Sequence, residues 1–181
     1  MSLVTGLGKD FGLSKQALES LEGKAMDQIC HNGFWMVASG RSHCAHFVSH
    51  VLGVSTGGTC RAMGDKPTGW GASMRLDEVY RACPLRGFWE ARPPALLSCL
   101  AFVVLQKKRP DGSWQTQVRA HGSDMNYERY RHVGIYLKGN VWHFHNGRKQ
   151  VVAEPLKHFR TRYESHGPAD LLFGSLPSRT C

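Results

Sequence analysis

The sequence predicts a single α+β domain in which helices pack on a small antiparallel sheet, and three observations support this. The 181 residues are 41% hydrophobic and 20% charged, a balance typical of globular proteins. Apolar residues recur at helical spacing in the N-terminal third, whereas the later apolar segments are short and bounded by turn residues, as strands are. No linker composition interrupts the chain, so we expect one domain over residues 1–181.

Two helices are expected near the N-terminus, and we expect them to pack together. Ser14 is a good N-cap for a helix that continues to Ile29. The second helix begins at Cys44, carries an apolar stripe and stops at Gly53. Residues 74–82 predict a short third helix, which the following Cys-Pro pair closes.

The strands are expected in the second half of the chain. Residues 97–105 predict a buried strand, and residues 106–131 are polar and long enough for a lid or an insertion. Residues 132–137 and 141–145 predict a hairpin, because Lys-Gly-Asn lies between them. Residues 150–153 predict a third strand of the same sheet.

Cys44 and His132 are the residues in this sequence that best fit nucleophilic chemistry. A thiol at a helix N-terminus gains thiolate character from the unpaired N–H groups, and a histidine on a neighbouring strand can take its proton. His132 opens its strand, and Gly134 allows close backbone approach on the same face. His143 and His145 share a face of the next strand and can orient the base. The pattern predicts a cysteine hydrolase.

Metal-dependent chemistry is the alternative at this site. His132, His143 and His145 could together hold a catalytic zinc ion, but this leaves Cys44 without a role. We therefore expect neither a metal nor an organic cofactor. His46 and His50 lie one helical turn apart, and we expect a structural or surface role for them rather than ligation.

The six cysteines lack the paired spacing of a zinc knuckle. Cys30 and Cys99 lie in apolar stretches and are expected to be buried free thiols. Cys60 and Cys83 lie beside turn residues, so a disulfide between some pair stays open.

The charge balance favours an anionic partner or a solubilising surface. Lys and Arg number 23 against 14 Asp and Glu, a net charge of +9, but no helix carries the basic stripe of a nucleic-acid reader. No apolar run is long enough to span a bilayer, so no stable membrane insertion is expected. Residues 1–11 lack the pattern of a signal peptide, which predicts that another machine delivers any exported protein.

Three segments together resemble the NlpC/P60 superfamily of papain-like cysteine peptidases and amidases, which mostly cut peptidoglycan stem peptides. They are the motif Cys44-Ala45-x-Phe47-Val48, the strand at residues 97–105, and His132-Val-Gly-Ile-Tyr-Leu with its hairpin partner. The resemblance covers residues 33–153. It implies a papain-like core in which Cys44 is the nucleophile, His132 the base and His143 the orienting residue, with His145 as the fallback.

The sequence also departs from the family pattern. His43 stands where the family usually has Asp or Asn, and Phe34 and Trp35 stand near the place of an upstream tyrosine. The Gly-Asp turn usual before the middle strand is missing. Oxyanion stabilisation is therefore expected from backbone N–H groups such as that of Cys44.

A small basic amidase without a signal peptide resembles the type VI secretion effectors that bacteria inject into a competitor. This implies synthesis in the bacterial cytoplasm, action on peptidoglycan in the periplasm of a target cell, and a cognate immunity protein. We expect a monomer that does not bind nucleic acid. A phage or housekeeping wall hydrolase is the near alternative.

Two other functions stay open. Cys44-x-His46-Phe47-Val48 also resembles the lecithin:retinol acyltransferase-like branch, which implies lipid acyl transfer or phospholipase activity. In that branch the histidine strand precedes the cysteine helix, whereas here Cys44 precedes His132. The third function is a non-catalytic basic module that binds the cell wall or nucleic acid.

Overall fold

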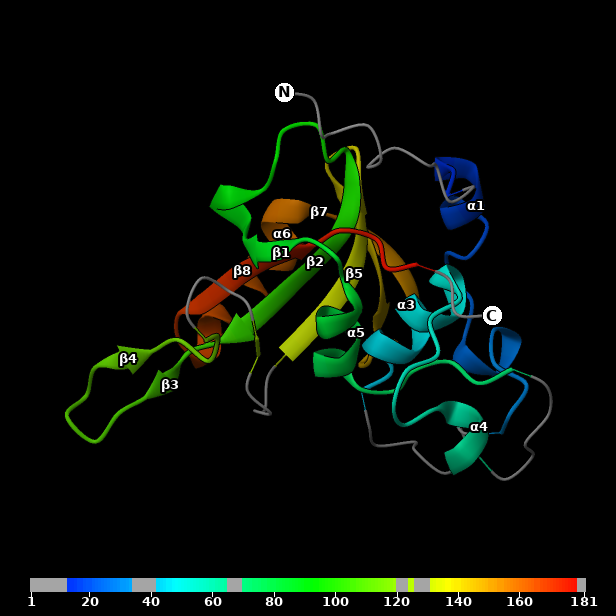
Figure 1. The fold of residues 1–181 in the computed structure, drawn as a ribbon, viewed down its shortest axis with the longest axis horizontal. Coiled ribbons are helices and arrows are strands. Elements are labelled where there is room, and N and C mark those ends of the chain that lie inside the picture. Colours follow the sequence, from blue (N-terminus) through cyan, green and yellow to red (C-terminus); the bar gives the residue numbers. More distant parts are fainter. Residues whose placement is uncertain (1–12, 34–41, 65–69, 120–123, 126–130, 179–181) are drawn as a thin grey trace.

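A six-stranded antiparallel sheet forms the centre of the molecule, in a computed structural model that describes residues 13–33, 42–64, 70–119, 124–125 and 131–178. Its strand order is β1-β8-β2-β5-β6-β7 (Figure 1). The strands are β1 (Arg86–Phe88), β2 (Ser98–Leu105), β5 (Arg131–Leu137), β6 (Asn140–His145), β7 (Gln150–Pro155) and β8 (Ala169–Gly174). Two short strands, β3 (Lys107–Lys108) and β4 (Trp114–Gln115), pair separately in a hairpin that projects from the sheet (Figure 1).

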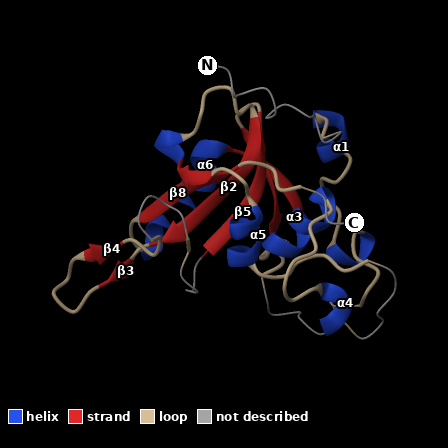
Figure 2. Ribbon diagram, in the orientation of Figure 1, coloured by secondary structure: helices blue, strands red, loops and turns tan. Residues whose placement is uncertain are grey.

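Helices lie on both faces of this sheet (Figure 2). They are α1 (Lys15–Glu19), α3 (Cys44–Leu52), α4 (Cys60–Met63), α5 (Leu76–Ala82) and α6 (Leu156–Arg160). The described residues also contain three 3₁₀ turns, η1 (Met26–Gln28), η2 (Trp89–Ala91) and η4 (Thr161–His166). The predicted α+β class is confirmed.

Side chains alternate along the central strands and so divide the core into two parts. On one face Phe102 and Val133 pack with α3 and α5 in the larger cluster. On the other face Val103 packs with Phe159 of α6 and with the η4 residue Tyr163. A residue of β5 therefore meets α3 or α6 according to whether its number is odd or even.

The predicted hairpin is confirmed as β5 and β6. Its two turn residues, Lys138 and Gly139, have φ values of 49° and 88°. Positive φ at both central positions is the type I′ geometry that matches the twist of paired strands. The predicted strands at residues 97–105 and 150–153 are confirmed as β2 and β7, which extend to Leu105 and Pro155.

The helix from Cys44 is confirmed, and it ends in left-handed Gly53 with φ of 69°. The first helix is shorter than expected. Ser14 does cap it, because its Oγ accepts from the Ala17 N–H at 3.0 Å, but α1 ends at Glu19. Hydrogen bonds of 2.9 Å then join Gly23 and Lys24 to Val151 of β7, so edge-strand pairing replaces the helix.

The C-terminal strand was not anticipated from the sequence. β8 inserts between β1 and β2 and pairs with both. The predicted long segment at residues 106–131 contains the β3–β4 hairpin, and part of it lies outside the described residues. Phe34, Trp35 and residues 1–11, on which expectations were also placed, lie outside them too. Within the described residues, no helix has the length and apolar character needed to cross a membrane.

Candidate functional site

Cys44 is the first residue of α3, the helix that packs against β5 and β6. Its thiol accepts hydrogen bonds from the Ser42 hydroxyl, at 3.1 Å, and from the backbone N–H of Val133. The residue is buried, with 3% of its surface exposed. The thiol therefore lies directly against the peptide bond that joins His132 to Val133.

A short segment before α3 fixes the start of this helix to the end of β6. The backbone N–H of His43 donates to Asn146 Oδ1 at 3.1 Å, and Asn146 Nδ2 donates to Ser42 Oγ at 3.0 Å. Asn146 thus holds the residue that in turn donates to the thiol. Asparagine after a strand is commonly a turn residue, so this role could not be predicted from residue type and position.

The two strands of the hairpin separate where Cys44 lies. The β5–β6 ladder begins at the turn and stops at the pair Ile135 and Trp142. The Val133 N–H lies beyond the last pair, and the Cys44 sulfur accepts its hydrogen bond in place of a strand. The thiol consequently lies at the open end of the hairpin.

The His132 side chain lies on the α6 face of the sheet. It is opposite Val103 in the β2–β5 ladder, and its ring packs 5.6 Å from that of Phe159. Its Nε2 lies 2.9 Å from Nδ1 of His143. Gly134 makes this contact possible, because a Cβ there would lie 3.0 Å from Cβ of His143. This is the close approach that the sequence predicted for Gly134.

His143 continues a chain of polar contacts toward β7. Its Nε2 lies 2.9 Å from Glu154 Oε1 and 2.9 Å from a guanidinium nitrogen of Arg162, and Arg162 also donates to Glu154. When His143 Nε2 carries the proton, it and Arg162 both donate to the Glu154 carboxylate, and the 2.9 Å contact between His143 Nε2 and Arg162 joins two donors that share this acceptor. His143 Nδ1 is then the acceptor of the His132 Nε2–H, and His132 Nδ1 carries a lone pair.

Burial decides the protonation of the histidines. Burial, together with the charges of His143 and Arg162, holds the pKa of His132 well below its ordinary value. Burial also lowers the pKa of His143, partly offset by Glu154. Burial opposes ionisation of Glu154, yet its hydrogen bond and charge interaction with His143, and the Arg162 cation, lower its pKa to about 2. The chain consists of two neutral imidazoles and a carboxylate.

Burial opposes the thiolate character that the helix start was expected to give Cys44. Burial raises the pKa of the thiol, although hydrogen bonds from Ser42, Val133 and Ala45 and the Arg131 cation all act in the opposite direction. The cost of removing a charged sulfur from water exceeds the benefit of the helix N-terminus. The resting site is therefore a neutral thiol beside a neutral imidazole.

The structure brings some of the predicted site residues into contact and leaves others apart. The Cys44 thiol contacts the backbone beside His132, and His132 contacts His143, but within the described residues no hydrogen bond links the thiol to the His132 ring. His145, the fallback, lies elsewhere: its Nδ1 accepts from the Arg148 N–H at 3.1 Å, and its ring is 6.1 Å from that of His143. His143 has both nitrogens occupied by protein groups, which leaves it no free lone pair for the three-histidine zinc site.

Sequence reasoning missed the carboxylate. Glu154 is opposite Val141 in the β6–β7 ladder, which places it diagonally next to His143 on the same face. Extending the predicted strand from residue 153 to Pro155 would have found it. Arg162 and Tyr163 come from η4, which carried no sequence signal, and Tyr163 lies close enough to Cys44 for the thiol to help raise its pKa.

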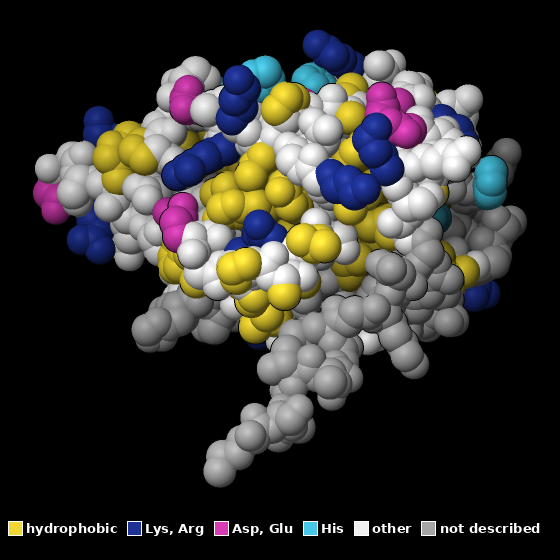
Figure 3. Space-filling view, turned by 90° about the horizontal axis from the view of Figure 1, so that it is seen from above, with side chains coloured by type: hydrophobic (Ala, Val, Ile, Leu, Met, Phe, Trp, Pro, Cys, Tyr) yellow, Lys and Arg dark blue, Asp and Glu magenta, His cyan; other side chains and the backbone are white. Residues whose placement is uncertain are grey.

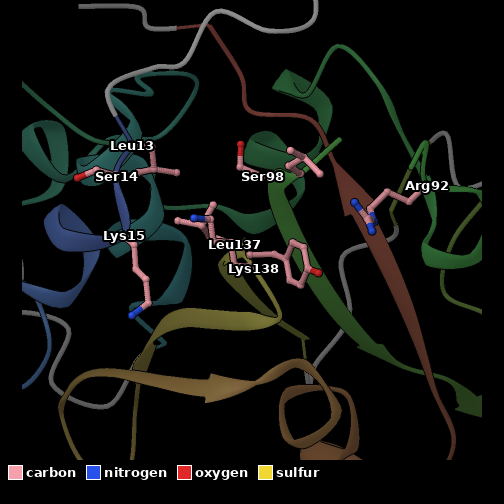
Figure 4. Close-up of a pocket in the computed structure, with 9 residues that line it drawn as sticks. Leu13, Ser14, Lys15, Arg92, Ser98, Leu137 and Lys138 are labelled. Atoms are coloured by element: carbon pink, nitrogen blue, oxygen red, sulfur yellow. The ribbon is translucent and has the colours of Figure 1, made fainter. Parts of the chain in front are cut away.

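One hollow in the described surface lies away from these residues. It encloses about 640 Å³ near the β5–β6 turn, between Leu13 to Lys15 on one side and Arg92 on the other (Figure 4). From above, hydrophobic side chains gather on this face with Lys and Arg beside them (Figure 3). Leu137 lines it, about 17 Å along β5 from His132. No cysteine or histidine lines this hollow, so the candidate for nucleophilic chemistry is the group around Cys44.

A second group of cysteine and histidine side chains is close by on the same helix. The ligand atoms of Cys30, His46, His50 and Cys60 all lie within 4.8 Å of one another, so these four residues could hold a metal ion. Cys30, Cys44, Cys60, Cys83 and Cys99 are all free thiols. In comparisons with known proteins, no family model, curated protein or solved structure matches this chain.

Proposed function

We propose that the chain is a cysteine hydrolase that cuts amide bonds in the stem peptides of bacterial peptidoglycan. One observation carries the proposal: a thiol at a helix start lies against the backbone of a histidine, which continues through a second histidine to a carboxylate. Nucleophile, base and orienting groups in this order are the parts that acyl transfer needs. The peptide substrate comes from the resemblance to NlpC/P60 enzymes.

The proposed reaction begins with a proton transfer from Cys44 to His132. His132 Nδ1 is the ring nitrogen not engaged by His143, so it takes the proton as the sulfur attacks the carbonyl carbon. The imidazolium formed is stabilised through His143 by the Glu154 carboxylate. Its proton then passes to the leaving amine, and an activated water releases the acid from the thioester.

The neutral resting pair suits a general-base mechanism. With the pKa of His132 lowered and that of Cys44 raised, the proton stays on sulfur until substrate excludes water and charge develops. Catalytic hydrogen bonds are often long before substrate binds and shorten in the complex. We expect the Cys44 to His132 contact to form at that stage, which requires the His132 ring to approach the thiol from the α6 face of the sheet.

Oxyanion stabilisation is proposed to come from the start of α3. The first backbone N–H groups of a helix have no partner inside the helix and point outward. Cys44 supplies one of them beside its own sulfur. Asn146 keeps this helix start in place through His43 and Ser42.

Digestion of purified sacculi tests the proposal. The wild-type protein should release peptide fragments that mass spectrometry identifies as amide hydrolysis products, and Cys44→Ala should lower that rate by at least about a thousandfold. Cys99→Ala is the matched control, because Cys99 is also a buried free thiol but lies on β2. Equal digestion by folded Cys44→Ala protein would contradict the proposal.

The same variants separate the other functions. Lipid acyl transfer predicts a hydroxylamine-sensitive acyl-enzyme from phospholipid vesicles and no fragments from sacculi. A non-catalytic wall- or nucleic-acid-binding module predicts binding that weakens with salt and is unchanged in Cys44→Ala. Delivery to a competitor's periplasm predicts that export to the periplasm is toxic and that an immunity protein suppresses it.

A further inference from the structure

Four metal-binding side chains converge from three separate segments. Cys30 follows η1, His46 and His50 lie one turn apart on α3, and Cys60 begins α4. Their ligand atoms lie within 4.8 Å of one another. Histidines at i and i+4 present their nitrogens on one side of a helix, which is the spacing that helical zinc sites use.

The separations between the ligand atoms fit a tetrahedral zinc ion. His46 Nε2 lies 3.1 Å from His50 Nε2, and His50 Nε2 lies 3.6 Å from Cys60 Sγ. With zinc–nitrogen bonds of about 2.1 Å and zinc–sulfur bonds of about 2.3 Å, tetrahedral geometry predicts about 3.4 Å and about 3.6 Å for these separations. Zinc binding would therefore move the two nitrogens slightly apart and bring any more distant donors closer together.

The groups around the four donors are those that a zinc site needs. Nδ1 of His46 lies 3.2 Å from Nδ1 of His43, which leaves Nε2 of His46 as the nitrogen that faces the other donors. The second nitrogen of a zinc-bound histidine is almost always held in this way. The partner fixes the orientation of the ring.

The Cys60 sulfur is surrounded by donors. Asn32 Nδ2 and the backbone N–H of Ala72 each point at it from 3.2 Å. Hydrogen-bond donors that point at a sulfur stabilise its charged form. A thiolate is the form that binds zinc.

We propose that Cys30, His46, His50 and Cys60 bind one zinc ion as a structural site. The two thiols lose their protons to solvent on binding, and two thiolates balance the charge of Zn²⁺ while the imidazoles stay neutral. Four protein ligands leave no position for a substrate, which is the arrangement of structural rather than catalytic zinc. Cys30, His46 and Cys60 have no exposed surface, so the ion would be shielded from water.

The ion would fasten three segments of the chain to one another. It would join the segment after η1 and the start of α4 to the helix that carries Cys44. This proposal differs from the sequence expectation of no metal and of a structural or surface role, rather than ligation, for His46 and His50. The site is distinct from the proposed hydrolase site, because Cys44 supplies no ligand to it.

Metal analysis of the purified, reduced full-length chain tests the proposal. We expect about one zinc per chain by plasma mass spectrometry, and below about a tenth in Cys30→Ser/Cys60→Ser. Cys83→Ser/Cys99→Ser is the matched control, since it also replaces two buried thiols and should keep the zinc. Cys44→Ala should keep it as well, even if that variant has lost all hydrolysis.

Cobalt gives a readout that does not depend on how the variants fold. Wild-type protein reconstituted with Co²⁺ should show the visible bands of tetrahedral cobalt and a thiolate-to-cobalt charge-transfer band. Chelation of the zinc should lower Tm, and added zinc should restore it. Wild-type protein with no bound zinc and no cobalt bands, or with a Cys30–Cys60 disulfide by intact mass, would overturn the proposal.

Discussion

Helix α3 contributes to two groups of cysteine and histidine side chains whose donor atoms are arranged in opposite ways. At its start, the groups form a line: thiol, His132 backbone, His132 ring, His143 ring and Glu154. On its other side, the donors of Cys30, His46, His50 and Cys60 all face a common point. Groups joined in sequence by hydrogen bonds can pass a proton from one to the next, whereas donors that face a common point can hold a cation.

The partners of the histidines show the same difference. In the line, both nitrogens of His143 contact protein groups, and the carboxylate at the end sets the direction of the protons. Around the point, one nitrogen of His46 contacts His43, and its other nitrogen faces His50 and the sulfurs. Residue type alone does not separate a proton relay from a metal site, but the arrangement of the donor atoms, in sequence along a chain or around one point, does.

The largest effect within the line is expected at His132. His132→Ala should lower hydrolysis of muropeptides by about a hundredfold to ten-thousandfold, because it removes the only proposed base. Zinc content should not change, since His132 lies outside the four-donor group. Loss of zinc together with activity would show that the two groups are not independent.

The reactivity of the thiol sharpens this prediction. Since burial raises the pKa of Cys44, alkylation by iodoacetamide should be slow at neutral pH and accelerate only above the ordinary thiol value of 9.0. A neutral His132 does not hold a thiolate, so His132→Ala should leave the resting rate nearly unchanged. Fast alkylation at neutral pH that His132→Ala abolishes would instead indicate a resting ion pair.

A smaller effect is expected at the orienting position. His143→Ala should lower turnover about tenfold to a hundredfold, the usual cost of losing a partner that orients a working histidine. His143→Asn should recover part of the loss, because an amide oxygen can accept the His132 N–H. His145→Ala is the matched control and should be mild, since His145 bonds to the Arg148 backbone. If His145→Ala lowered turnover more than His143→Ala does, His143 would not be the residue that orients His132.

The smallest effect is expected at Glu154. Glu154→Gln keeps an oxygen for the His143 N–H and removes only the charge, so turnover should fall by about tenfold or less. The carboxylate has a pKa of about 2, below its ordinary 4.5. Its ionised form therefore stabilises the fold fully above pH 4.5, and this contribution is lost as the pH falls toward 2. The Tm difference between the wild type and Glu154→Gln should narrow as the pH falls. A difference that stays constant would show that the ionised Glu154 carboxylate does not stabilise the fold.

The sequence predicted the elements that local patterns specify. The turn at Lys138 and Gly139, the stop at Gly53 and the N-cap at Ser14 were all readable, because each depends on residues close in the chain. The end of α1 was not, since pairing of Gly23 with the distant Val151 decides it. β8 also escaped, because its place between β1 and β2 depends on the whole sheet.

The candidate site could be anticipated only where residue type and spacing carried the information. Cys44, His132 and His143 could be predicted as site residues, because Cys44 begins a predicted helix and the two histidines lie on the strands of a predicted hairpin. The raised pKa of the thiol could not be read from its helix position, since burial by the folded chain outweighs it. The four-donor group was missed because Cys30 and Cys60 lie in separate segments, with no regular spacing in the sequence from His46 and His50.

Trapping of the covalent intermediate tests the central claim most directly. The wild-type protein is mixed with muropeptides, quenched in acid within the first turnover and examined by intact-protein and peptide mass spectrometry. We expect one acyl group per chain, carried on Cys44 as a thioester that hydroxylamine removes, and none on the Cys44→Ala variant. Hydrolysis that proceeds with no adduct, or with an adduct on any other residue, would contradict it.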